Sequence, residues 1–282
     1  MLVGCVWQAE PIVIGGGEPL RVVASHSDDA KTDPAAVVSE EEHSTPRAVT
    51  SGASPGGVLA RADAIRHRHP YHAEIGDLTL PRDAPAMRYA NLSPAACRQR
   101  LGQLDLELTK ANRATPGVAN PRRLGGSIQG VRYVAPGGGS PFGVLDCRLL
   151  LTLVEWSEWL REQGVVAVRV DNFYRPGAKL ARKRKPSQHS YGLAMDVMGL
   201  TLEDGTELDV ERDWGDPIGA TVCGPEARTT GLSSNGVQLR NVVCETARRG
   251  FFHHILTPSY NAAHRDHLHL DIKRDAPRMF LQ

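Results

Sequence analysis

Two segments that lie far apart in the chain constrain its fold more than any other feature of the sequence. Each places histidine and aspartate among apolar residues: residues 187–196 read SQHSYGLAMD and residues 264–271 read HRDHLHLD. Residues two apart in an extended strand lie on the same face, so His267 and His269 would share one face while Leu268 points into the core. A fold that uses both segments has to bring them together.

The two segments together offer the ligands that a zinc ion prefers. His189, Asp196 and His269 would supply two imidazoles and a carboxylate, and a set of three protein ligands leaves a fourth position for water. Asp196 lies in a hairpin pattern over residues 192–210, because Asp204-Gly205 supplies the positive φ angles of a tight turn. A ligand on a strand is preorganised. We therefore predict a metal site with Zn²⁺ as its cofactor.

The length and charge of the chain limit the class of protein it can be. Its 282 residues, 41% of them hydrophobic, suffice for one ordinary core and an additional tail. The formal net charge of +1 gives no support for a nucleic-acid partner. Residues 1–88 are rich in small residues, proline and acids and show little hydrophobic periodicity. We expect a disordered linker there and a folded domain over residues 89–282.

The first residues of the chain allow two interpretations. Leu2-Val3-Gly4-Cys5 resembles a bacterial lipobox, in which the cysteine carries a lipid after a signal peptide is removed. Under this interpretation the start codon lies further upstream, and Cys5 tethers the protein to a membrane. Under the other, Cys5 is an ordinary cysteine, since the apolar run of a signal peptide does not precede it.

The folded part shows a mixture of helix and strand patterns. A first helix begins at Ser93-Pro94, and the spacing of Leu101, Leu104 and Leu108 extends it to residue 108. Antiparallel strands with segregated helices give an α+β fold, with a small, mostly antiparallel sheet that carries the zinc site and is flanked by helices. We expect further helices over 146–163 and 233–249, and strands over 131–134, 165–170, 192–202, 206–210, 252–256 and 268–272.

The two motifs together, S-x-H-x-x-G-x-A-x-D and H-x-x-H-x-H-x-D, resemble the bacterial extensin-like C-terminal domain family. That family is similar in turn to the zinc peptidases typified by lysostaphin and the D-Ala-D-Ala carboxypeptidases. The resemblance runs from about Leu92 to Asp271 and includes Asp213-Trp214 and Cys244. Phe173-Tyr174-Arg175 departs from the family pattern, because many relatives carry a cysteine just before this arginine.

The resemblance implies a zinc-dependent peptidase that acts on peptidoglycan peptides, as a cell-wall D,D-endopeptidase or carboxypeptidase. His189, Asp196 and His269 would hold the ion that activates a water molecule. Two residues compete to move the proton of that water. His267 matches the non-ligand histidine of H-x-H members, and Asp266 matches the position of a glutamate in carboxypeptidase relatives. We favour His267, because strand alternation turns it toward the metal and turns Asp266 away.

Two further residues are assigned to the substrate. Arg175 would bind a substrate carboxylate, since the guanidinium fork suits bidentate contact and the related carboxypeptidases use an arginine in this region. Ser187, two residues before the ligand His189, would either contact the substrate or cap the turn.

The remaining histidines in and near the motifs are expected to have different roles, according to their positions. His264 and Asp271 complete the second motif, and we expect them to orient the ligands, because a ligating imidazole normally donates its other N–H to an acceptor. His253 and His254 carry no motif, so we expect them to be structural.

The five cysteines are Cys5, Cys97, Cys147, Cys223 and Cys244. Without Cys5 four remain, and three pairings are open. They lack the C-x-x-C spacing of a zinc site, so disulfides formed in an oxidising compartment are expected. We expect Cys223 to pair with Cys244 and Cys97 with Cys147. Free buried thiols in a cytosolic protein are the alternative.

Two other functions remain open. A non-catalytic, zinc-stabilised cell-wall binding module would keep the ligands and dispense with the base. A metal nuclease would fit the basic run over residues 179–185 but not the strand motif around Asp196. The peptidase interpretation places the protein in the periplasm or cell envelope, with peptidoglycan peptides as its partner and no nucleic acid.

Overall fold

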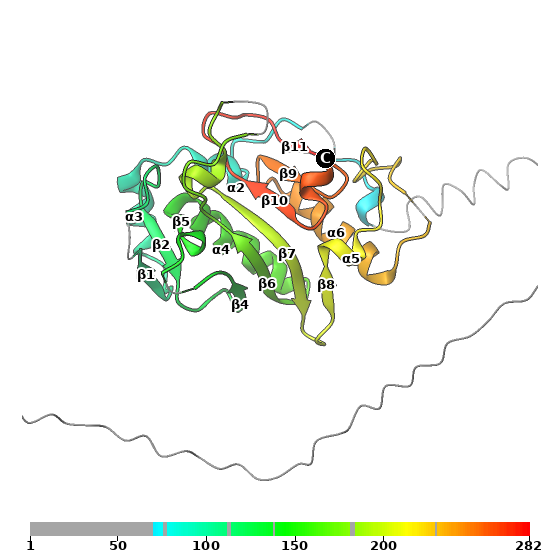
Figure 1. Ribbon diagram of the computed structural model, residues 1–282, viewed down its shortest axis with the longest axis horizontal. Coiled ribbons are helices and arrows are strands. Elements are labelled where there is room, and N and C mark those ends of the chain that lie inside the picture. Colours follow the sequence, from blue (N-terminus) through cyan, green and yellow to red (C-terminus); the bar gives the residue numbers. More distant parts are fainter. Residues whose placement is uncertain (1–69, 76–77, 112–113, 138, 181–183, 229) are drawn as a thin grey trace, which may run out of the picture. The chain divides into compact units, whose positions relative to one another are not determined.

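The computed structural model of the chain describes residues 70–75, 78–111, 114–137, 139–180, 184–228 and 230–282 (Figure 1). Residues 1–69 lie outside this part, and Cys5 lies among them, so the membrane tether stays a prediction. Within the described part of the chain, no helix is long and apolar enough to cross a membrane.

Eight strands form the main sheet of the described residues, in the order β11-β9-β10-β7-β6-β4-β3, with β8 paired to β7. Most neighbours run antiparallel, but β4 pairs with β6 and β11 with β9 in parallel. The α+β class is therefore confirmed, with a larger and mixed sheet in place of the small one predicted. The strands are β3 (Ser127–Ile128), β4 (Val131–Val134), β6 (Val165–Asn172), β7 (Ala194–Leu202), β8 (Glu207–Asp209), β9 (His254–Leu256), β10 (Leu268–Asp271) and β11 (Phe280–Leu281).

A second, three-stranded antiparallel sheet is built from β1 (Leu108–Lys110), β2 (Pro121–Leu124) and β5 (Leu145–Asp146). Its first strand corrects one expectation. The helix predicted to reach residue 108 ends at Leu101, with Gly102 as its C-cap, and Leu108 belongs to β1. Glycine interrupts the helix because it stabilises that conformation poorly, so the leucine spacing alone overstated the helix length.

Three of the described helices begin at capping residues that the sequence predicts. Ser93 accepts a hydrogen bond from Ala96 N, Asp146 from Arg148 N and Ser233 from Gly236 N, which satisfies backbone donors left free at a helix start. The two long helices thus confirm their predicted ranges. The helices are α2 (Pro85–Ala90), α3 (Pro94–Leu101), α4 (Cys147–Glu162), α5 (Val210–Asp213) and α6 (Ser234–Arg248), with short 3₁₀ turns η1 (Pro70–His72), η2 (Pro141–Gly143), η3 (Gln188–Tyr191) and η4 (Ala262–His264).

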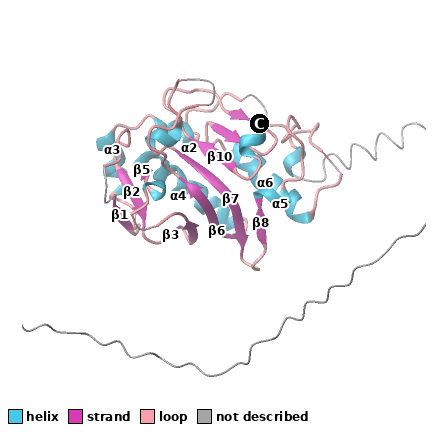
Figure 2. Cartoon of the chain, in the orientation of Figure 1, coloured by secondary structure: helices cyan, strands magenta, loops and turns pink. Residues whose placement is uncertain are grey.

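Helices α4 and α6 pack against one face of the main sheet, and Figure 2 shows α4 alongside the long strands β6 and β7. Trp156 of α4 donates its indole N–H to Thr246 of α6 over 3.0 Å. The same tryptophan borders a small apolar space that Val197 of β7 and Leu268 and Leu270 of β10 also line. Because side chains alternate along a strand, the neighbours of these residues point to the opposite face of the sheet.

Residues 70–75 and 78–88 pack on the domain, although the prediction assigns them to the linker. Tyr71, Leu80 and Ala86 are buried in the main core, and Ala86 N donates to Gly250 O over 3.1 Å. The folded part therefore begins before residue 89. The sequence concealed this because the segment buries single apolar side chains between prolines and charged residues, without a regular period.

Both predicted disulfides are present. Cys97 and Cys147 join α3 to the first turn of α4 with their Cα atoms 6.1 Å apart, and Cys223 and Cys244 join a loop to α6 with a Cα separation of 5.7 Å. Such bridges are typical of proteins that fold in an oxidising compartment.

Candidate metal centre

The pairing of three strands aligns the polar residues of the site. Asp196 of β7 lies opposite His269 of β10 on one side and opposite Asn172 of β6 on the other. All three side chains are buried. The strand register thus places a carboxylate between an imidazole and an amide, on the sheet face opposite α4 and α6.

The turn η3 delivers the third member, His189. Ser187 caps this turn, because its Oγ accepts a hydrogen bond from His189 N over 3.4 Å. Gly192 ends the turn with φ +63°, and a Cβ added there would lie 3.0 Å from Asp146 N. Glycine is therefore required at this position of the motif, and Ser187 performs the capping role that the sequence left open.

The three predicted ligand atoms form a nearly equilateral triangle. Nε2 of His189 lies 3.0 Å from Oδ1 of Asp196 and 3.0 Å from Nδ1 of His269, and the latter two atoms are 3.1 Å apart. Tetrahedral zinc with bonds of about 2.0–2.1 Å needs ligand atoms about 3.3 Å apart. The cluster is therefore close to the size that zinc requires, and these three residues could hold a metal ion.

The outer hydrogen bonds of the two imidazoles direct their lone pairs inward. Nδ1 of His189 lies 3.0 Å from the carbonyl oxygen of Phe173, and Nε2 of His269 lies 3.0 Å from Oδ2 of Asp271. Since both partners can only accept, each of these ring nitrogens carries the hydrogen. When both rings are neutral, the opposite nitrogens meet Asp196 as acceptors, so three lone pairs converge and favour a cation between them.

The charges of the buried side chains also favour a cation in the site. Burial lowers the pKa of His189, so this imidazole stays neutral. Burial also opposes a charge on His269, but hydrogen bonds to Asp196 and Asp271 outweigh it and raise its pKa to about 9. Although burial acts against ionisation, the adjacent imidazoles of His189 and His269 hold the pKa of Asp196 well below its usual range. The two carboxylates thus retain positive charge at His269, as a proton or as a metal ion.

Asp271 connects the ligand His269 to a residue that the motifs did not reveal. Its other oxygen, Oδ1, lies 2.8 Å from Nδ1 of His254. Despite burial, hydrogen bonds from His254 and His269 lower the pKa of Asp271 to about 2. His254, predicted to be only structural, therefore orients the carboxylate that orients a ligand. The sequence alone does not show that His254 lies opposite Asp271 in the β9–β10 register.

Asn172 is the second residue that sequence reasoning missed. Its Nδ2 donates to Oδ2 of Asp196 over 2.9 Å and to Oδ2 of Asp171 over 2.8 Å. The amide fixes the free oxygen of the carboxylate ligand, which leaves Oδ1 directed at the two imidazoles. Pairing between β6 and β7 is irregular around Asn172, so simple alternation along β6 could not have placed it.

His267 and Asp266 lie beside the cluster as a hydrogen-bonded pair. Nε2 of His267 is 3.6 Å from Oδ1 of Asp196, and its Nδ1 is 2.8 Å from Oδ1 of Asp266. A hydrogen bond from His267 lowers the pKa of Asp266. Asp266 thus lies on the far side of the ring from the metal cluster and leaves the lone pair of Nε2 facing the ligands.

Two further predicted residues border the same cluster. The guanidinium of Arg175 approaches Oδ2 of Asp196 to 3.7 Å, and its side chain is 48% exposed. His264 donates from Nδ1 to Asn261 Oδ1 over 2.9 Å and packs against His267 with 5.1 Å between ring centroids. Burial, with the neighbouring imidazoles, lowers the pKa of His264 to about 4. His264 therefore supports His267 as a neutral ring.

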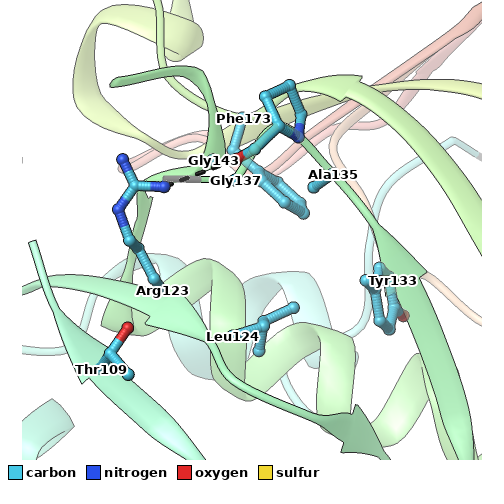
Figure 3. Close-up of a pocket in the computed structure, with 9 residues that line it drawn as sticks. Thr109, Arg123, Leu124, Tyr133, Ala135, Gly137, Gly143 and Phe173 are labelled. Atoms are coloured by element: carbon cyan, nitrogen blue, oxygen red, sulfur yellow. Dashed lines mark hydrogen bonds between the residues drawn. The ribbon is translucent and has the colours of Figure 1, made fainter. Parts of the chain in front are cut away.

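A cavity of about 330 Å³ lies near the site without containing any of the three ligands (Figure 3). Figure 3 shows Arg123 and Leu124 on one side of it and Phe173 and Tyr133 on others. Arg123 donates to the carbonyl oxygens of Pro136 and Ser140, so its charge holds the surrounding loop. Phe173 connects the cavity to the metal centre, because it lines the cavity and its carbonyl oxygen accepts a hydrogen bond from Nδ1 of His189.

Comparison with known proteins identifies the family. The family model described as the extensin-like protein C-terminus matches residues 95–280. No curated protein and no solved structure matches the chain. The matched range covers most of the 282 residues and includes every residue of the metal cluster. The chain therefore belongs to the extensin-like C-terminal family.

Proposed function

We propose that the protein is a zinc-dependent peptidase that cleaves peptide bonds of peptidoglycan. One observation carries the proposal: the converging lone pairs of His189, Asp196 and His269 lie beside a fourth imidazole, His267, that is not part of the triangle. Metal-assisted hydrolysis needs a three-ligand site with a base within reach. A purely structural zinc site is usually closed by four protein ligands.

Zinc bound here would acidify a water molecule and polarise the scissile carbonyl. The chain's own residues perform the proton transfers. His267, with its Nε2 lone pair facing the cluster, takes a proton and later gives it to the leaving amine. Asp266 accepts the hydrogen bond from Nδ1 and so holds the ring in this orientation. This division of roles favours His267 over Asp266 as the base.

Arg175 is proposed to bind a carboxylate of the substrate. Its guanidinium is half exposed while one nitrogen lies 3.7 Å from the ligand Asp196, so part of its hydrogen-bonding fork is directed away from the protein. A guanidinium binds carboxylates in bidentate fashion. Peptidoglycan peptides carry free carboxylates near their cross-links, which suits this position next to the metal.

The cellular setting follows from the same proposal. A peptidoglycan substrate places the protein in the periplasm or cell envelope. The disulfides Cys97–Cys147 and Cys223–Cys244 are consistent with export to such an oxidising compartment. The resemblance of the two sequence motifs to those of cell-wall zinc peptidases also supports this setting.

The proposal is tested with the full chain, loaded with zinc and incubated with purified sacculi and defined muropeptides. Mass spectrometry should detect cleaved peptides, a chelator should abolish them and added zinc should restore them. His267→Ala should lower the rate by about 100-fold or more and keep the metal. Arg265→Ala is the matched control, because its side chain on the same loop is 71% exposed and its ion pair, among the described residues, is with Glu211. It should leave the rate unchanged.

One result would overturn the proposal in favour of the alternative binding module. In that case the zinc-loaded protein binds sacculi but releases no peptide, and His267→Ala binds them as well as the unmodified chain.

A further inference from the structure

A second cavity, of about 620 Å³, borders the turn that carries His189. Gln188 and Tyr191 of that turn line it, and Arg148, Lys273 and Arg274 supply three cationic side chains. None of its lining residues is acidic. The cavity does not include the metal ligands, so its charge serves some purpose other than zinc binding.

Arg148 is the central cation of this cavity. The residue is only 7% exposed, and its Nε donates to Oδ1 of Asp146 over 2.7 Å. Its two terminal nitrogens have no hydrogen-bond partner among the described residues and are not fully enclosed, so a ligand in the cavity can reach them. A mostly buried arginine whose terminal nitrogens face a cavity is suited to bind an anionic ligand there.

The carboxylate of Asp146 does not neutralise the positive charge of the side chains that line the cavity. It also accepts hydrogen bonds from the backbone N–H groups of Ala119 (3.0 Å), Asn120 (3.3 Å) and Arg148 (3.0 Å). Its charge is therefore shared with the N-terminus of α4 and a neighbouring loop. Lys273 and Arg274 are both exposed and form no salt bridge within the described part of the chain.

The remaining walls of the cavity are largely apolar. Leu92, Pro94 and Leu193 line it together with the side chain of Tyr191. A cavity of 300–1,000 Å³ with an apolar wall and a few convergent polar groups is typical of a site for a small organic molecule. The combination favours a ligand with an anionic head and a hydrocarbon part over a bare inorganic ion.

The walls are held in place by covalent and steric constraints. The disulfide Cys97–Cys147 fixes α3 to the first turn of α4, and these elements carry Pro94 and Arg148. On the opposite wall, a Cβ at Gly117 would lie 2.6 Å from the carbonyl oxygen of Ser190, so only glycine allows this loop to approach η3. A preformed cavity loses little entropy on binding a ligand.

We propose that this cavity binds a small organic acid. Its carboxylate or phosphate would contact the terminal nitrogens of Arg148, with Lys273 and Arg274 at the entrance. Its hydrocarbon part would lie against Leu92 and Leu193. This site is separate from the proposed peptidase centre and needs no metal.

The test uses the full chain with three probes that have six carbon atoms each: hexanoate, hexyl phosphate and neutral hexanol. Binding is followed by NMR through the methyl signals of Leu92 and Leu193, with the core residue Leu149 as an internal reference. At least one anionic probe should bind about tenfold tighter than hexanol, since a charge-assisted hydrogen bond contributes that much. The tighter of the two anions identifies the class of ligand.

Matched variants separate the cavity from general surface charge. Lys273→Ala/Arg274→Ala should weaken the anionic probe about tenfold. Arg82→Ala/Arg132→Ala changes the net charge equally at exposed positions outside the cavity, and it should leave binding unchanged. Arg148→Lys keeps a cation near Asp146 but removes the two terminal nitrogens of the guanidinium. It should therefore also weaken binding of the anionic probe. The proposal is overturned if hexanol binds as tightly as both anions, or if the two double variants weaken binding equally.

Discussion

His269 and Asp196 face each other across β10 and β7, and their Nδ1 and Oδ1 atoms lie 3.1 Å apart. The register of the two strands therefore determines the metal cluster. A slip of one residue would turn one of the two side chains toward α4 and α6, because strand side chains alternate. The same pairing that buries Leu268 and Leu270 against the helices brings the ligands together on the other face.

Removal of any ligand should abolish metal binding. We expect about one zinc ion per chain in the purified protein and almost none in His189→Ala, Asp196→Ala or His269→Ala, because two ligands hold zinc poorly. Elemental analysis by mass spectrometry gives the stoichiometry. His253→Asn, a change at a buried histidine outside the triangle, is the control and should retain the ion. Full zinc content in any of the three ligand variants would contradict the assigned site.

Loss of the orienting carboxylate should weaken zinc binding without abolishing it. Asp271→Ala removes the acceptor of His269 Nε2, and such changes lower metal affinity by about 10–100-fold. His254→Phe keeps a ring but removes the donor to Asp271, so its loss should be smaller. Competition with a zinc-binding dye measures both. Asp105→Ala, at an exposed position, should match the unmodified protein. Equal affinity for Asp271→Ala and this control would exclude the orienting role.

Acid should destabilise the fold through His253. Burial lowers the pKa of this residue to about 4 from an ordinary value of 6.5, and its Nδ1 accepts a hydrogen bond from Lys273 N over 3.0 Å. Between pH 6.5 and 4, His253 is protonated in the unfolded chain but not in the folded chain. The free energy of unfolding therefore decreases as the pH falls from 6.5 to 4. The slope approaches about 1.4 kcal/mol per pH unit for one such group.

The variant His253→Asn keeps an acceptor for Lys273 and does not titrate. Urea unfolding of the metal-free proteins at pH 7, 5.5 and 4.5 should therefore show the unmodified chain losing more stability than the variant. Parallel losses in the two proteins would mean that His253 does not carry this effect.

The disulfide that closes the longer loop should contribute more to stability. Cys97–Cys147 encloses a sequence separation of 50 and Cys223–Cys244 one of 21. Loop-closure entropy gives about 4 and about 3 kcal/mol respectively. Urea unfolding of Cys97→Ala/Cys147→Ala and of Cys223→Ala/Cys244→Ala compares the two bridges. An unchanged free energy of unfolding in either double variant would show that its bridge does not restrict the unfolded chain.

The sequence predicted the parts of the site that local patterns encode. His189, Asp196 and His269 stand at motif spacings, and the strands β7 and β10 follow from alternating apolar residues. Helices α4 and α6 follow from a capping residue at one end and a glycine at the other. These features depend on neighbours in sequence, so they can be read without the fold.

The parts that escaped prediction depend on contacts between distant segments. Asn172 reaches Asp196 only through the irregular β6–β7 pairing, and His254 reaches Asp271 only through the β9–β10 register. The short strands β1 to β3, and residues 70–75 and 78–88, each bury too few side chains to show a period. No local signal distinguishes such residues from loops.

The wide separation of the ligands along the chain also fixes when the centre can be completed. During synthesis, His189 and Asp196 emerge on adjacent elements well before His269, which lies 73 residues beyond Asp196. A nascent chain can offer only two ligands, and the third arrives when β10 joins the sheet as one of its last strands. If the cluster binds zinc as proposed, tight binding should mark a chain whose folding is finished, and a chain truncated before Leu268 should take up the ion only weakly.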